Sequence, residues 1–195
     1  MNIFKHPSAV IFFVGFIVYL SIRGYYARRS KQIAKVHRQI DVLEQFLLLL
    51  VIPSSGLLPF LYLFTPWLSL ADYRAPTFVP WIGVVLMPFA VWLFWRSHAD
   101  LGRNWSVSLE ICKEHQLVTD GVYRFIRHPM YAALFLWSLA QALVLPNWLA
   151  GCLPLATFSL MYLLRTPREE LMMSQVFGQE YREYMSKTGR LIPRF

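Results

Sequence analysis

Long apolar runs with few charges are the feature that most limits how this chain can fold. Five such runs lie at about residues 4–22, 43–64, 76–95, 130–145 and 148–164. Their lengths are close to the roughly 20 residues that a helix needs to cross a bilayer. Only 15% of the residues are charged, against roughly 25% in a soluble domain. The sequence therefore predicts an all-α, polytopic membrane protein with five transmembrane helices, folded as a single domain over residues 1–195.

Three of the runs depart from a plain span. The second contains Pro53, Ser54, Ser55, Gly56 and Pro59, which predict a kink whose freed backbone groups are satisfied by hydroxyls or by neighbouring helices. The last two runs are short for full spans, and Pro146-Asn147 between them predicts a tight helical hairpin. The domain then divides into a three-span half, 1–95, and a second half, 96–195.

The positions of Lys and Arg test the number of spans, because cytoplasmic loops carry an excess of both. With five spans, 17 of the 19 basic residues fall on one side, in three groups at 23–38, 96–127 and 165–194. If residues 130–164 formed one long helix, the division would be 11 against 8. The pattern favours five spans, an external N-terminus and a cytoplasmic C-terminus. The net charge of +8 is then explained by loops beside the membrane, and we expect no nucleic-acid partner.

The segment after the fifth run has the pattern of an amphipathic helix. Thr166-Pro167 indicates a helix start, with Thr166 as N-cap and Glu169 and Glu170 near the positive end of the helix dipole. Glu, Met, Phe and Tyr recur at positions 169, 173, 177 and 181, so one face is apolar with an acid at its top. Arg165, one turn earlier, would stack with Glu169. The pair has two readings: a surface ion pair that anchors an interfacial helix, or a charged pair at a pocket on the membrane edge.

The loop before the fourth run, EHQLVTDGVYRFIRHPMY at 114–131, is rich in groups that bind ligands. Asp120-Gly121 predicts a turn. His128 precedes a proline, which favours an extended backbone, and Pro129 can then open the fourth helix. The N–H groups at that helix end could bind a carboxylate or a phosphate, beside His128, Tyr123 and Tyr131. Alternatively, His128 is a capping or interfacial histidine, and the tyrosines belong to the aromatic belt of the membrane.

Missing motifs narrow the chemistry. The chain has no GxG, HExxH or GxSxG sequence, which argues against a Rossmann dinucleotide site, a Walker loop, a zinc protease and a serine hydrolase. The histidines are scattered, and Cys112 and Cys152 lack the spacing of metal ligands. We therefore expect no metal site.

Two motifs in the second half are specific in combination. They are LVT-x-G-x-Y-x-x-x-RHP-x-Y, at 117–131, and EE followed by FG-x-EY-x-x-Y, at 169–184. Together they resemble the isoprenylcysteine carboxyl methyltransferase family, which is related to phospholipid methyltransferases. The resemblance covers about residues 100–195. It implies a membrane-embedded methyltransferase that uses S-adenosylmethionine and releases S-adenosylhomocysteine, with residues 96–195 as its catalytic half.

The resemblance also implies a site at the cytoplasmic face, with the C-terminal helix closing over it. Arg165 would bind and orient the substrate carboxylate, and Glu169 would act beside it as the second catalytic residue. Glu169 or Glu170 would hold a polar group of the cofactor. The remaining cofactor contacts would be His115, Gln116, Leu117, Val118, Tyr123, His128, Pro129, Met130 and Tyr131.

The implied reaction is methyl transfer to the carboxylate of a lipid-linked, prenylcysteine-like substrate that enters from the bilayer. One alternative is methylation of a lipid amine, such as a phospholipid head group. A second is an NADPH-dependent membrane sterol or isoprenoid reductase, because those enzymes share the RHP-x-Y type of segment. A channel or transporter ranks last, since the central parts of the five runs carry no charge.

Overall fold

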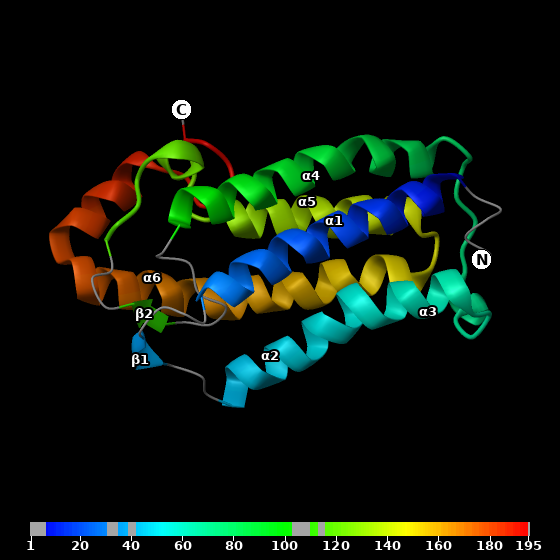
Figure 1. Cartoon of the computed structure of the whole chain (residues 1–195), viewed down its shortest axis with the longest axis horizontal. Coiled ribbons are helices and arrows are strands. Elements are labelled where there is room, and N and C mark those ends of the chain that lie inside the picture. The colour runs from blue at the N-terminus through cyan, green and yellow to red at the C-terminus, as the bar shows by residue number, and fades with distance from the viewer. Residues whose placement is uncertain (1–6, 31–34, 39–41, 103–109, 113–115, 195) are drawn as a thin grey trace.

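The computed structural model describes residues 7–30, 35–38, 42–102, 110–112 and 116–194, and all five apolar runs are helical in it (Figure 1). Four helical segments are long and apolar enough to cross a membrane, and the shorter α5 is also apolar. The bounds are α1 Pro7–Ser30, α2 Val42–Ile52, η2 Pro53–Leu57, α3 Leu58–Phe64, η3 Ser69–Ala71, α4 Val79–Leu101, η5 Gly121–Arg124, α5 Pro129–Val144, η6 Trp148–Cys152 and α6 Leu153–Lys187. The strands β1, Lys35–Arg38, and β2, Glu110–Cys112, pair antiparallel. The predicted helical membrane fold is confirmed.

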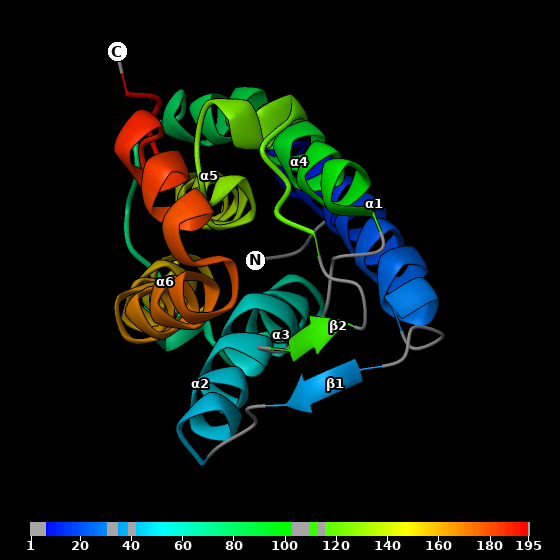
Figure 2. The same cartoon turned by 90° about the vertical axis from the view of Figure 1, so that its left-hand side faces the viewer.

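Helix α5 runs through the middle of the bundle, between α4 on one side and α6 on the other (Figure 2). Gly83 of α4 permits a close approach, because a Cβ there would lie 2.7 Å from the carbonyl oxygen of Ala140. Small residues have this role in membrane helix packing. Aromatic rings fill the space toward α1, where the ring centroids of Phe12 and Trp137 lie 5.5 Å apart. Helices α1 and α4 of the N-terminal half therefore pack against α5.

The irregularity expected in the second run is a π-helical turn, η2. The hydroxyls of Ser54 and Ser55 both donate to the carbonyl of Val51, at 3.1 and 2.6 Å. The hydroxyl of Ser54 also lies 2.8 Å from that of Thr157 on α6. Side-chain hydroxyls thus satisfy backbone groups as predicted, and they link the second span to α6.

The expected hairpin between the last two runs is organised by the buried Asn147. Its side-chain oxygen accepts hydrogen bonds from the backbone N–H groups of Leu149 and Ala150, so Asn147 is an N-cap. Its amide nitrogen donates to the carbonyl of Leu68, at 2.7 Å, and to the carboxylate of Asp72, at 2.8 Å. One side chain therefore fixes both the hairpin and the loop after α3.

The predicted helix start at Thr166-Pro167 is wrong. Helix α6, Leu153–Lys187, runs through Pro167 without a break, and Thr166 is buried. Proline removes only one backbone donor, and the Leu, Arg and Glu residues on both sides are good helix formers. The break lies instead at Gly178, with φ 54° and ψ −121°.

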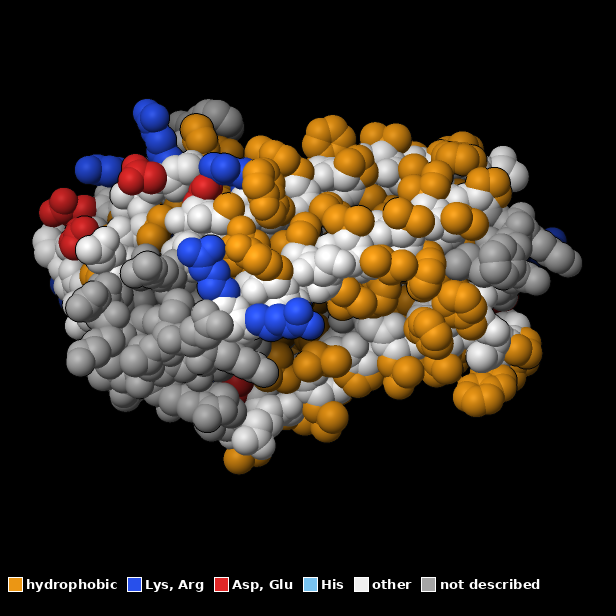
Figure 3. Space-filling view, in the orientation of Figure 1, with side chains coloured by type: hydrophobic (Ala, Val, Ile, Leu, Met, Phe, Trp, Pro, Cys, Tyr) orange, Lys and Arg blue, Asp and Glu red, His pale blue; other side chains and the backbone are white. Residues whose placement is uncertain are grey.

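The structure is divided lengthwise into an apolar part and a charged end. The helix formed by η6 and α6 has 40 residues, far more than the roughly 20 that a helix needs to cross a bilayer. Its apolar part, 148–164, can span a membrane, and its charged part, 165–187, lies beyond it. Charged side chains gather at this end, while apolar side chains cover the rest of the visible face (Figure 3). The protein is an integral membrane protein.

Candidate active site

The loop before α5 and the C-terminal segment are joined by backbone hydrogen bonds. The N–H of Arg127 donates to the carbonyl of Gly189, at 2.8 Å, and the N–H of His128 donates to that of Arg190, at 3.0 Å. His128 has φ −123° and ψ 59°, which is neither helical nor the extended conformation expected before a proline, and α5 begins at Pro129. The two segments that were expected to form one site therefore lie against each other.

Glu170 is the centre of a buried charge cluster. Its Oε1 lies 3.2 Å from Nε2 of His128 and 3.2 Å from Nε of Arg127, and its Oε2 accepts from Arg190 at 2.6 Å. Burial by itself would raise the pKa of Glu170, but the hydrogen bonds from His128 and Arg190 and the charge of Arg127 outweigh it and lower the pKa to about 2. Glu170 is thus an ionised structural group that ties the C-terminal segment to the loop.

Glu169 points elsewhere. It lines the main cavity, which Glu170 does not, and its Oε2 accepts a hydrogen bond of 3.0 Å from the hydroxyl of Tyr131. The ring of Tyr131 packs edge-on against His128, with centroids 5.5 Å apart. Two neighbouring glutamates therefore have separate roles, because consecutive residues on a helix face about 100° apart.

Arg165 and Glu169 share one face of α6 as expected, since both line the cavity. Within the described ranges, however, the carboxylate that pairs with Arg165 is Glu44 in the first turn of α2. Nη1 of Arg165 and Oε1 of Glu44 are 2.9 Å apart. The expected ion pair with Glu169 is replaced by one that crosses between two helices.

The cavity has a volume of about 240 Å³ and extends from the charged end into the apolar part of the bundle. Its charged-end wall is formed by Gln116, Leu117, Val118, Tyr123, Tyr181 and Tyr184. Its inner wall comes from α2, α5 and α6 and includes Leu48, Val51, Ile52, Leu134, Phe158 and Met161. Along the helices, Tyr131, Arg165 and Glu169 lie between the two walls. The site is therefore polar at one end, apolar at the other, and charged at the junction.

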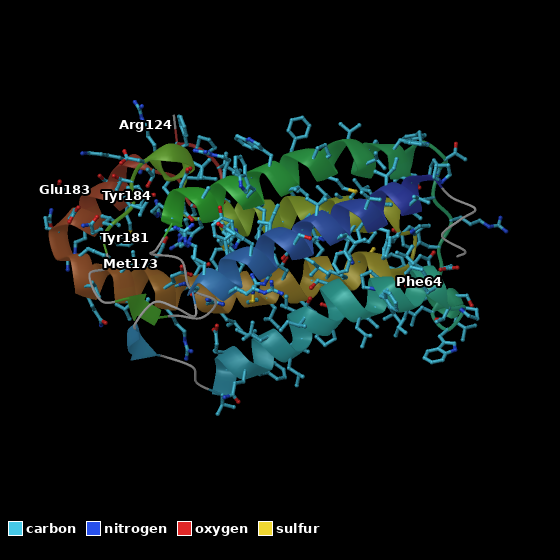
Figure 4. All side chains as sticks on the ribbon, viewed as in Figure 1. Phe64, Arg124, Met173, Tyr181, Glu183 and Tyr184 are labelled. Atoms are coloured by element: carbon cyan, nitrogen blue, oxygen red, sulfur yellow. The ribbon has the colours of Figure 1, made fainter. Side chains whose placement is uncertain are left out.

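The end of α6 closes the charged end of the cavity. After the break at Gly178, the helix returns over the loop, and Tyr181 and Tyr184 are buried there. Figure 4 labels Met173 on α6 before the break and Tyr181 and Tyr184 after it, all toward the inner side, with Glu183 on the outer side and Phe64 at the far end of the molecule. Burial, with Glu169 nearby, raises the pKa of Tyr123 well above its usual value. Tyr123 is consequently a neutral hydrogen-bonding group in this wall.

Most of the site residues predicted from sequence meet in this cavity. Those that line it are Gln116, Leu117, Val118, Tyr123, His128, Met130, Tyr131, Arg165 and Glu169. Pro129 does not line it but is buried as the first residue of α5, and His115 lies outside the described residues. Among the described residues, no group of three or more His, Cys, Asp or Glu side chains is placed to hold a metal ion.

Sequence reasoning missed three charged residues at or beside the cavity. Arg23 of α1 and Arg127 line it, and Glu44 pairs with Arg165. The count of basic residues treated Arg23 only as a topological charge. For Glu44 a signal was present, because it interrupts the apolar stretch VLEQFLLLL, and an ionisable residue in such a stretch indicates a functional site.

Comparisons with known proteins point to one family. Residues 81–175 match the model of the isoprenylcysteine carboxyl methyltransferase (ICMT) family. A probable protein-S-isoprenylcysteine O-methyltransferase from Oryza sativa subsp. japonica is 32% identical over 124 residues, which is 60% of this chain and 62% of that protein. The Homo sapiens protein-S-isoprenylcysteine O-methyltransferase is 31% identical over 124 residues, 63% of this chain and 44% of that protein. The chain thus spans less than two thirds of the length of either relative.

A solved structure agrees with the sequence matches. It is the structure of the eukaryotic intramembrane Ras methyltransferase ICMT without a monobody. The TM-score is 0.54 and the sequence identity is 26%. The match covers 80% of this chain and 54% of the other chain. The matched region includes nearly all of α4, all of α5 and most of α6, and α5 and α6 supply much of the lining of the cavity. The family model, the relatives and the solved structure agree, and they show that this chain is similar to the isoprenylcysteine carboxyl methyltransferase family over about half of its length.

Proposed function

We propose that this protein is an S-adenosylmethionine-dependent methyltransferase that esterifies the carboxylate of a prenylcysteine-like lipid. The observation that carries the proposal is a single cavity with a polar end, an apolar end and the charged pair Arg165 and Glu169 at the junction. A water-soluble donor and a lipid acceptor need such a site, since each must enter from a different phase.

The polar end fits S-adenosylmethionine. The carboxylate of Glu169 faces the cavity and accepts one hydrogen bond from Tyr131, so it retains capacity for an ammonium group. Tyr181 and Tyr184 offer aromatic faces that suit an adenine ring and a sulfonium cation. When bound, S-adenosylmethionine would supply a methyl group on a positively charged sulfur, which makes the methyl carbon electrophilic.

The inner end fits the lipid part of the acceptor. Leu48, Phe158 and Met161 would surround the isoprenoid chain, and Arg165 would orient the carboxylate. One oxygen of that carboxylate forms a bond to the methyl carbon while the carbon–sulfur bond breaks and its electron pair goes to sulfur. No proton is transferred, so the residues need only align the acceptor and exclude water. The neutral Tyr123 is consistent with a site that uses no general base.

The site would face the cytoplasm. The end of the bundle that holds it carries the end of α1, the end of α4, the loop before α5 and the charged part of α6, which include the described basic residues at 23–29, 96, 124–127 and 165–194. Basic residues are enriched on the cytoplasmic side. Its N-terminus would then be external. The acceptor would reach the cavity from the bilayer, between α2 and its neighbours, while the donor would arrive from the cytoplasm.

The test is methyl transfer by the detergent-purified protein with methyl-labelled S-adenosylmethionine. Separate reactions contain farnesylated N-acetylcysteine or phosphatidylethanolamine, and calorimetry measures binding of S-adenosylhomocysteine and of NADPH. We expect an alkali-labile label on the farnesylated acid and binding of S-adenosylhomocysteine alone. An alkali-stable label on the amine, or binding of NADPH alone, would refute the proposal.

A pair of matched variants tests whether Glu169 binds the cofactor. Glu169→Gln should lose at least about tenfold in affinity for S-adenosylhomocysteine, since a charged hydrogen bond contributes roughly 1.5–3 kcal/mol. Glu183→Gln is the control, because Glu183 lies on the same helix but is exposed. Equal losses in both variants would contradict the assignment of Glu169.

A further inference from the structure

We propose that Glu44 is a positioning residue that holds Arg165 at the cavity and shares its charge, so that the acceptor carboxylate is oriented without being bound too tightly. The proposal rests on the function proposed above. It concerns a residue outside the matched region 81–175 and outside both motifs at 117–131 and 169–184.

The ion pair between Glu44 and Arg165 lies in a dry environment. The side chain of Glu44 is 4% exposed and that of Arg165 is 13% exposed. Removing two such charges from water costs several kcal/mol per ion, and replacing such a pair by apolar residues is often neutral or stabilising. Stability therefore gives little reason for this pair, and its position at the wall of the cavity gives a better one.

The geometry of Arg165 leaves one edge for a ligand. Nη1 lies 2.9 Å from Oε1 of Glu44. Nε is buried and, among the described residues, has no hydrogen-bond partner. Nε and Nη2 form the opposite edge of the guanidinium fork, which is the edge that binds a carboxylate through two parallel hydrogen bonds. Glu44 thus fixes the rotation of the fork so that an unused donor remains at a residue lining the cavity.

The charge of Glu44 helps to meet two opposing requirements of the reaction: the acceptor carboxylate must be oriented, and its oxygen must remain a good nucleophile. A lone arginine in a low-dielectric site would attract the acceptor carboxylate strongly, which stabilises the ground state and weakens the oxygen as a nucleophile. Tight binding of the ground state does not speed the chemical step. Because Glu44 lies 2.9 Å from Arg165 and offsets part of its charge, the acceptor meets directed hydrogen bonds with a smaller net attraction.

The experiment compares Glu44→Gln and Glu44→Ala with Ser54→Ala. The last variant removes the other polar link between the second span and α6, the hydrogen bond of 2.8 Å to Thr157. For each we would measure kcat and KM for farnesylated N-acetylcysteine, binding of S-adenosylhomocysteine, and binding of the farnesylated acid relative to its methyl ester.

Glu44→Gln keeps an oxygen acceptor but removes the charge. We expect kcat to fall roughly tenfold while KM falls, and the preference for acid over ester in binding to rise by about the same factor. Glu44→Ala also frees the guanidinium, so KM should rise as kcat falls. In both variants, and in Ser54→Ala, binding of S-adenosylhomocysteine should stay within about twofold of the wild-type value.

Two results would overturn the proposal. One is a Glu44→Gln protein that matches Ser54→Ala in kcat, KM and acid-over-ester preference. The other is a parallel loss of acceptor and S-adenosylhomocysteine binding, which indicates a purely structural pair. The acid-over-ester preference is a binding measurement, so it decides the role of Glu44 even if the wild-type protein transfers no methyl group and the proposed function fails.

Discussion

The hydroxyl of Tyr184 donates a hydrogen bond of 2.6 Å to the backbone carbonyl of Tyr123, and both residues are buried. Sixty-one residues of chain separate them. This contact holds the last turns of α6 against η5, so the C-terminal segment closes one end of the cavity. Both tyrosines line that cavity, which makes the bond a direct link between local stability and the shape of the site.

Tyr184→Phe should therefore weaken the closed end without unfolding the protein. The substitution leaves a buried carbonyl without its donor, at a cost of about 1–3 kcal/mol. We expect a lower melting temperature in detergent and severalfold weaker binding of S-adenosylhomocysteine. Tyr25→Phe is the control, because Tyr25 is exposed. An unchanged affinity in Tyr184→Phe would show that the bond does not shape the site.

The two adjacent glutamates should separate binding from stability. Glu170→Gln removes the charge that compensates Arg127 and Arg190, and breaking a buried ion pair costs about 3–5 kcal/mol. Glu169→Gln leaves that cluster intact. We expect thermal unfolding to shift strongly only in Glu170→Gln, and cofactor affinity in the folded protein to fall mainly in Glu169→Gln. A large thermal shift in Glu169→Gln together with weaker cofactor binding in Glu170→Gln would mean that the roles assigned to the two glutamates are exchanged.

Gly178→Ala should strain the backbone at the bend of α6. Its φ of 54° disfavours a Cβ by about 1–2 kcal/mol, although no atom lies within 4 Å of the position that the Cβ would take. Gly24→Ala also meets open space but lies in the regular helix α1, where alanine is favoured. Only Gly178→Ala should lose stability and cofactor affinity. Similar melting temperatures for the two variants would mean that the bend is not held by Gly178.

Asn147→Asp should destabilise the opposite end of the bundle without affecting the site. The change removes two donors and places a carboxylate 2.8 Å from the position of the Asp72 side chain. We expect a loss of about 3 kcal/mol from unsatisfied groups and like charges. The double variant with Asp72→Asn should recover part of it. Affinity for S-adenosylhomocysteine should remain within about twofold, since distant sites act independently.

The sequence was sufficient to predict the five helical runs, because each depends on a long local apolar pattern. It also located the irregular turn at Pro53 and the hairpin at Asn147, since proline, glycine and serine mark such places directly. The continuity of α6 through Pro167 was not predicted. A single missing backbone donor is a weak local signal there, and good helix formers on both sides outweigh it.

The site was predictable where a motif defines it and not where tertiary contacts do. Gln116, Tyr131 and Glu169 follow from the motifs and line the cavity. The partner of Arg165 lies 121 positions away, on α2, and nothing in the local pattern of α6 points to it. Likewise, the choice between Glu169 and Glu170 depends on where Arg127 and Arg190 fold, which is a property of the whole chain.

Helix α6 carries its apolar stretch and Glu169 on one unbroken rod. Glu169 lies about 8 Å beyond Leu164 along the axis, at 1.5 Å per residue. A helix whose apolar length differs from the thickness of the bilayer tilts or shifts to match it. Any such adjustment is transmitted along the rod to the carboxylate at the proposed methyl-transfer centre. The rate of the proposed methyl transfer should therefore depend on the thickness of the host membrane as well as on the concentrations of donor and acceptor.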